Sequence, residues 1–264
     1  MPAKFVKSIG RTLDARPDRL DLRDREFTPA VASLPEEFPG DGTIRQLLPR
    51  YYKAGLILDQ GEEGACTGFG LACVVNYLLW RDRLRQRSRT RQKTVSARML
   101  YHLARFYDEW PGEDYQGSSC RGALKAWHKH GVCTEALWPY RDAEGTVKFI
   151  RPLDGWAEDA LQRRIGVYYR VNRASVVDMQ SAIIEIGAIY VSCDVHDGWE
   201  IEVRNNRSRV MSRYQSSSPS RTRTRSVGTP LHSSGSIAQD LSCRTPGVSN
   251  GATAGSACCR TRSG

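Results

Sequence analysis

The chain carries, about a quarter of the way along, the stretch Asp59-Gln60-Gly61-Glu62-Glu63-Gly64-Ala65-Cys66-Thr67-Gly68-Phe69. A glycine-rich loop here leads into an apolar segment with helical spacing, and Cys66 stands where the two meet. A helix N-terminus favours a thiolate through its dipole and its free N–H groups. The small residues Gly64 and Ala65 leave room for a substrate backbone to approach. The pattern therefore predicts a nucleophilic cysteine.

Gln60 lies six residues before Cys66, and its side-chain amide can donate to an oxyanion. The backbone N–H of Cys66 supplies another donor of the same kind. The alternative is a buried cysteine that only packs at the start of a helix. Gln60 and the glycine loop together favour the nucleophile over this alternative.

This stretch resembles the active-site segment of the papain-like cysteine peptidases, where Gln and Gly precede Gly-Ser-Cys-Trp-Ala-Phe. The resemblance implies that Cys66 is the nucleophile and that Gln60 is the oxyanion-hole amide. Thr67 stands where the family usually has Trp. Glu63 stands where secreted members usually have a disulfide cysteine, which fits a reducing compartment.

Three further segments resemble the same family in the same order, namely Ser96–Tyr101, Gly117–Ala123 and Gly131–Tyr140. Of these, Gly117–Ala123 is similar to the glycine-rich stretch that lines the family's substrate cleft. The resemblance therefore implies four substrate-binding residues, which are Gly64, Ser118, Ser119 and Gly122. It extends over roughly residues 20–200.

Hydrophobic spacing supports an α+β fold with helices first and strands later. Helical spacing is found near residues 69–79, 99–106, 124–127 and 179–186, and strand patterns at 165–171 and 187–192. The resemblance implies two lobes meeting at a cleft, with a complete helical lobe and a β-rich lobe that is cut short. We expect an extended arm with little regular structure over residues 1–50, an incomplete peptidase domain over 51–202, and a disordered tail over 203–264.

Composition argues against several other classes of protein. The chain of 264 residues has a net charge of +10, but residues 201–264 hold ten Arg and only two acidic residues. The body is therefore nearly balanced, and no nucleic-acid partner is expected. No apolar run is long enough to span a bilayer and no secretion signal is visible, so a cytoplasmic location without membrane contact is expected. The eight cysteines show no zinc spacing, and no metal or cofactor is expected.

The catalytic His and Asn of the family have no counterpart in the chain as written. The five histidines are His102, His128, His130, His196 and His232. None lies in the family's Gly-Gly-His-Ala context, and no segment reads Asn-Ser-Trp-Gly. We expect little or no peptidase activity from this exact chain, because the thiol lacks its base.

A reading-frame shift in the gene near residues 200–215 is our hypothesis for this loss. When the last base of each codon is read with the first two bases of the next, residues 226–230 permit Gly-Gly-His-Ala. In the same frame residues 243–248 permit Gln-Asn-Ser-Trp-Gly. Fourteen of the last 62 residues are Ser, which fits translation of a GC-rich gene out of frame. Stop codons in that other frame of the gene would rule the hypothesis out.

The expected partner is a peptide or protein substrate, and the sequence gives no oligomeric state. The first 50 residues are shorter than the usual inhibitory propeptide of the family, so latency of that kind is not expected. Three alternatives stay open. They are a pseudo-peptidase that binds peptides without cutting them, an arginine-rich nucleic-acid binder, and a transferase on the same scaffold.

Overall fold

The structure is a computed structural model that describes residues 4–6, 11–30, 41–88, 90–108, 110, 116–194, 234–237 and 256–260. The helices in these ranges are α1 (Asp41–Lys53), α2 (Cys66–Arg85), α3 (Ala97–Phe106), α4 (Cys120–His130), α5 (Trp156–Leu161) and α6 (Val176–Ile186). The strands are β1 (Lys4–Val6), β2 (Arg11–Leu13), β3 (Ala15–Arg16), β4 (Ser118–Ser119), β5 (Val167–Val171), β6 (Ile189–Asp194), β7 (Ser234–Ile237) and β8 (Ser256–Arg260). None of the described helices is both long and apolar enough to cross a membrane.

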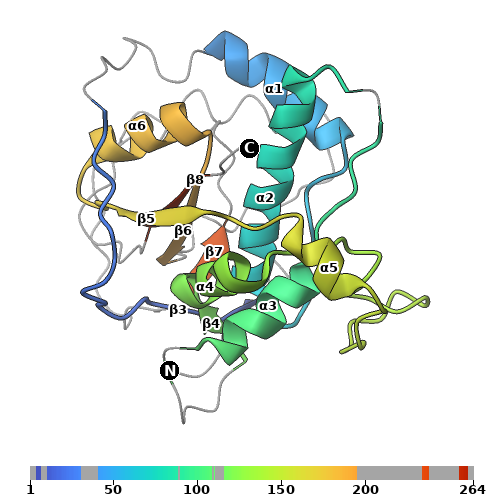
Figure 1. The fold of residues 1–264 in the computed structure, drawn as a ribbon. Helices are drawn as coiled ribbons and strands as arrows, with labels where there is room; N and C mark the ends of the chain where they lie inside the picture. The colour runs from blue at the N-terminus through green and yellow to red at the C-terminus, as the bar shows by residue number, and fades with distance from the viewer. Residues whose placement is uncertain are drawn as a thin grey trace, which may run out of the picture.

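The helical lobe is built around α2, which is buried along most of its length (Figure 1). Helix α3 crosses α2 at Gly68, where an added Cβ would lie 2.5 Å from the Cβ of Tyr101. Only a residue without a side chain permits so close an approach of the two helices. Leu71, Met99 and Leu124 are fully buried where α2, α3 and α4 share one core. The expectation of a complete helical lobe is confirmed.

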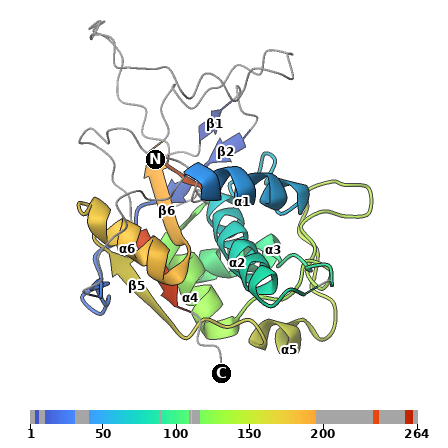
Figure 2. The same ribbon diagram turned by 90° about the horizontal axis from the view of Figure 1, so that it is seen from above.

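A four-stranded sheet with α6 beside it lies on the other side of the molecule from α3 and α5 (Figure 2). Its strand order is β5-β8-β6-β7, and every neighbouring pair is antiparallel. Val171 and Ala182 form a small separate core between β5 and α6. The fold is therefore of the expected α+β class.

Two strands of this sheet come from the segment that we expected to be a disordered tail. Strand β8 pairs with both β5 and β6, and β7 pairs with β6. The expectation is wrong for these nine residues, because strand pairing uses backbone groups and does not require apolar side chains. Strands β5 and β6 offer N–H and C=O groups that such segments can pair with. The rest of residues 203–264, and with it His232, lies outside the described residues, as does His196.

The N-terminal arm has more regular structure than we expected. Helix α1 begins at Asp41, and its Leu47 and Tyr51 contact the main core. Residues four apart lie on one helical face, so this pair anchors α1 to the body. Pro49 lies inside the helix, and the proline content of the arm led to the wrong expectation there. Residues 17–25 contain no helix or strand, as expected of an arm.

Candidate active site

Cys66 is the first residue of α2 and is 1% exposed. Helices α3, α4 and α6 are each preceded by a capping serine, whose side chain accepts a hydrogen bond from a backbone N–H of the first turn. The residue before Cys66 is Ala65, and no side chain caps α2. The first turn of α2 contains no acidic residue. A thiolate at Cys66 therefore lies at a helix end whose dipole is not offset by a cap or an acidic side chain.

Gln60 is buried, and its amide nitrogen donates two hydrogen bonds. One goes to the backbone carbonyl of Thr12 at 2.9 Å and the other to the carbonyl of Glu63 at 3.1 Å. The hydroxyl of Tyr140 donates to the backbone carbonyl of Gln60 at 2.9 Å. These hydrogen bonds hold both the side-chain amide and the backbone of Gln60 in place. The Gln60 amide N–H that the sequence predicted for an oxyanion therefore donates to a carbonyl oxygen from a distant part of the chain.

The segment around Asp14 is held against the glycine-rich stretch at Gly117. One carboxylate oxygen of Asp14 accepts from the N–H of Gly117 at 2.8 Å and from the N–H of Gln116 at 3.1 Å. Strand β3 then pairs in parallel with β4, with Ala15 opposite Ser118. An added Cβ on Gly117 would overlap the backbone carbonyl of Asp14. The arm therefore packs on the same stretch that the resemblance assigned to the substrate cleft.

Burial raises the pKa of Asp14, although the N–H groups of Gly117 and Gln116 and the charge of Arg16 oppose this rise. The carboxylate thus loses contact with water in the docked arm, and hydrogen bonds from the backbone offset part of that loss. Gly64 also lies near this carboxylate, since an added Cβ there would be 3.3 Å from the Cβ of Asp14. The structure brings Gly64, Gly117 and the arm together.

Ser118 and Thr67 join the start of α2 to β4. Their two hydroxyl oxygens share a short hydrogen bond, and both side chains are fully buried. The hydroxyl of Tyr190 in β6 donates to the backbone carbonyl of Thr67 at 2.7 Å. The side chain of Thr67, in the position where the family usually has Trp, thus contacts β4, and its backbone carbonyl joins α2 to β6.

The other two predicted substrate-binding residues lie in the packing of α3 against α4. The hydroxyl of Ser119 accepts from the N–H of Gly122 at 3.0 Å and caps α4. An added Cβ on Gly122 would lie 2.8 Å from the carbonyl of Ala104. These contacts account for both residues structurally, and substrate binding by Ser119 and Gly122 stays a prediction.

The three described histidines contact aromatic side chains. His102 lies 5.5 Å from Trp138, His128 lies 5.8 Å from Tyr168, and His130 lies 5.7 Å from Tyr107, measured between ring centroids. Burial, with Arg98 and Arg105 nearby, lowers the pKa of His102. These contacts account for the three side chains as packing residues.

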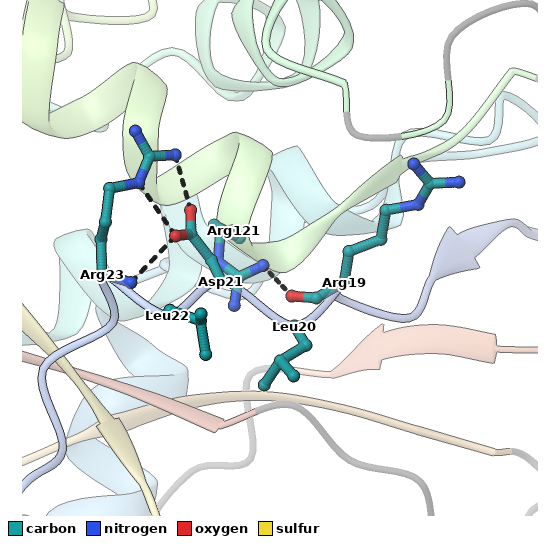
Figure 3. A pocket seen from close by; sticks show the side chains of 6 residues that line it. All are labelled: Arg19, Leu20, Asp21, Leu22, Arg23 and Arg121. Atoms are coloured by element: carbon teal, nitrogen blue, oxygen red, sulfur yellow. Dashed lines mark hydrogen bonds and ion pairs between the residues drawn. The ribbon is translucent and has the colours of Figure 1, made fainter.

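A cavity of about 430 Å³ lies at the arm and not at Cys66 (Figure 3). It is lined by Arg19, Leu20, Asp21, Leu22, Arg23 and Arg121. The guanidinium groups of Arg23 and Arg121 bond to Asp21 and to the carbonyl of Arg19, respectively (Figure 3). The guanidinium of Arg19 lies 4.4 Å from the ring centroid of Trp110. The arginines that line the cavity already have partners, so the cavity is a poor candidate for an anion site.

Several residues that shape the site were not predicted from the sequence, among them Asp14, Arg98, Tyr140 and Tyr190. Asp14 and Tyr190 lie 52 residues before and 124 residues after Cys66, so no local spacing connects them to it. Arg98 and Tyr140 lie in segments that resembled the family, but the resemblance concerned those segments and gave neither side chain a role. The signal for Arg98 was a charged residue within an apolar helical face, where burial requires a partner.

No protein-family model matches the chain, and no curated protein matches it either. Among solved structures it is similar to xylellain, a cysteine protease from Xylella fastidiosa. The identity is 24%, the TM-score is 0.51, and the match covers 70% of this chain and 67% of that one. Procathepsin L 3 from the larval midgut of Tenebrio molitor matches at 18% identity and a TM-score of 0.40, over 53% of this chain and 41% of that one. The match to xylellain shows that the chain has a papain-like fold.

Proposed function

We propose that the chain derives from a cysteine peptidase in which Cys66 attacks the carbonyl carbon of a peptide bond. The amide of Gln60 and the N–H of Cys66 would hold the oxygen of the tetrahedral intermediate. One observation carries this assignment, namely that the amide of Gln60 donates to a backbone carbonyl, that of Thr12, at 2.9 Å. A peptide carbonyl is the group that an oxyanion hole receives.

The position of Cys66 supports the same assignment. The thiol lies at an uncapped helix start, and Gly64 and Gly117 lie nearby around the docked arm. The N–H of Gly117 donates to Asp14, so it is a donor that an extended peptide could use once the arm leaves. A base is still needed for turnover, and we propose that the frame shift removed both the His and its Asn partner.

The test uses two versions of the protein, the chain as given and the chain with its reading frame restored after residue 205. We expect only the restored chain to hydrolyse a fluorogenic peptide, and we expect Cys66→Ala to abolish that activity. Hydrolysis by the chain as given, lost in Cys66→Ala, would contradict the loss of the base. Absence of activity in both versions would contradict the peptidase assignment.

A pseudo-peptidase is the other candidate, and the docked arm favours it. The arm shows that an extended segment fits beside Gly117 through hydrogen bonds from Gly117 and Gln116. A peptide that binds the restored chain without being cut would support this candidate. Isothermal titration with the peptide of the hydrolysis assay measures its binding, and binding by the restored chain without hydrolysis separates the pseudo-peptidase from the peptidase.

A further inference from the structure

Arg98 is a buried arginine that grips the loop before Cys66. It lies in the first turn of α3 and is 2% exposed. Its Nη1 donates to one carboxylate oxygen of Glu63 at 2.9 Å, and its Nη2 lies 2.9 Å from the other. This hydrogen bond and the close charge contact beside it hold the carboxylate of Glu63 against the guanidinium.

The guanidinium of Arg98 is itself held in place from two other sides. It lies 4.2 Å from the ring centroid of Tyr140, a cation–π distance. Its Nη2 also donates to the backbone carbonyls of Tyr140 and Lys148, at 3.4 and 3.3 Å. Arg98 therefore gives Glu63 a rigid anchor and not a mobile surface charge.

Two routes lead from Arg98 to Gln60. In the first, the pairing holds Glu63, whose backbone carbonyl accepts from the amide of Gln60 at 3.1 Å. In the other, the guanidinium packs on Tyr140, whose hydroxyl donates to the backbone carbonyl of Gln60 at 2.9 Å. The carbonyl of Glu63 also accepts from the N–H of Ala65, the residue before Cys66. Both the oxyanion amide and the start of α2 thus depend on the place of Glu63.

We infer that Arg98 is a positioning residue that sets the orientation of the Gln60 amide and the start of α2 through Glu63 and Tyr140. Its importance for catalysis rests on the proposed peptidase function. Its effect on Gln60 does not, because that effect can be measured in the chain as it exists.

The first measurement is the NMR signal of the Gln60 side-chain amide, assigned by its absence in Gln60→Ala. We expect Arg98→Gln to move the two amide proton shifts toward those of solvent-exposed glutamines. Arg98→Lys keeps the charge but loses the planar fork, so we expect it to move the signal in the same direction. Arg163→Gln is the matched control, because Arg163 also pairs with a carboxylate and with backbone carbonyls in the helical lobe.

The other measurement is the rate at which iodoacetamide alkylates Cys66 at pH 7, followed by peptide mapping. Arg98→Gln leaves the carboxylate of Glu63 unbalanced near the thiol, so we expect the rate to fall by about threefold. Glu63→Gln leaves the positive charge unbalanced, and we expect the rate to rise by about the same factor. Unchanged rates in both variants would show that the start of α2 does not depend on this pair.

Four outcomes decide between a positioning role and a purely structural one. A shifted Gln60 signal with a changed alkylation rate supports the positioning role, whether or not the restored chain cuts a peptide. An unshifted signal in folded Arg98→Gln and Arg98→Lys overturns it, even if the restored chain is an active peptidase. Alkylation rates that are unchanged in both Arg98→Gln and Glu63→Gln overturn the role at the start of α2. Failure of Arg98→Lys to fold would assign Arg98 to the core alone and would overturn the role as well.

Discussion

The amide of Gln60 and the carbonyl of Thr12 are 48 residues apart in sequence and 2.9 Å apart in space. The arm that carries Thr12 thereby fills the donor on which the proposed chemistry depends. Two residues further along the arm, Asp14 accepts from the backbone at Gly117. The same short segment thus contacts both the proposed oxyanion hole and the glycine-rich stretch.

Replacing Asp14 by Ala should loosen the arm and uncover the thiol. The variant loses the hydrogen bonds from Gly117 and Gln116, which to a charged acceptor contribute about 1.5–3 kcal/mol each. The raised pKa of Asp14 shows that burial offsets part of this gain. We expect alkylation of Cys66 by iodoacetamide to become roughly tenfold faster, a change of about 1.4 kcal/mol. Leu22→Ala is the control, because Leu22 is 93% exposed in the same arm; an equal rate in both variants would contradict the docking role of Asp14.

Gly68→Ala should destabilise the helical lobe. The new Cβ would meet the Cβ and backbone N of Tyr101 at 2.5 and 2.6 Å, and backbone cannot yield as a flexible side chain can. We expect a loss of about 1–3 kcal/mol in the free energy of unfolding, measured by urea denaturation. Gly166→Ala serves as the control, since nothing lies within 4 Å of its added Cβ. Equal stability of the two variants would show that α2 and α3 can move apart.

The helical lobe could be predicted from sequence because its cues are local. The apolar spacing after Cys66 and around Leu100 indicated helices, and α2 and α3 are found there. Boundaries were less accurate, since α2 runs to Arg85 and α6 begins three residues earlier than expected, at Val176. Charged residues such as Arg83 and Arg85 hide the end of a helix from an analysis of apolar spacing.

The arm contacts could not be predicted, because they join residues that no spacing connects. Asp14 meets Gly117 across 103 residues, and strand β3 is only two residues long. The pairing of β8 between β5 and β6 was missed for a related reason. Its residues, Ser256–Arg260, carry no strong strand pattern, and backbone pairing joins them to the sheet in the register found.

Asp24→Ala should be far more costly than Asp21→Ala, although the two carboxylates belong to the same arm. Asp24 pairs with Arg121 and Arg170, which joins the arm to α4 and β5. The side chain of Arg121 is 4% exposed, so Asp24→Ala removes a carboxylate from a buried guanidinium. We expect a loss of about 3–5 kcal/mol for Asp24→Ala.

The matched change is mild because Asp21 pairs with Arg23, whose side chain is 85% exposed. We expect Asp21→Ala to leave the free energy of unfolding nearly unchanged. Urea denaturation of both variants gives the comparison directly. A similar loss in the two would mean that the Asp24 pairs contribute no more than surface ion pairs.

His130 should make the fold less stable as the solution becomes acidic. Burial, followed by the charges of Lys129 and Arg164, lowers the pKa of His130 below its ordinary value of 6.5. Its Nε2 lies 2.7 Å from the hydroxyl oxygen of Tyr107, and the planes of the two rings are tilted relative to each other. Because the unfolded chain takes up the proton first, the free energy of unfolding is fully retained above pH 6.5 and falls as the pH drops toward the lower pKa of the folded state.

The measurement is urea denaturation at pH 7.5 and at pH 5.5 for the parent chain, His130→Gln and Tyr107→Phe. His130 is only partly buried, so we expect its contribution to the pH dependence to be less than about 1 kcal/mol. His130→Gln should remove that contribution. Tyr107→Phe should keep it, because the histidine still titrates beside Lys129 and Arg164. A pH dependence that is the same in His130→Gln and in the parent would assign the acid sensitivity to other groups.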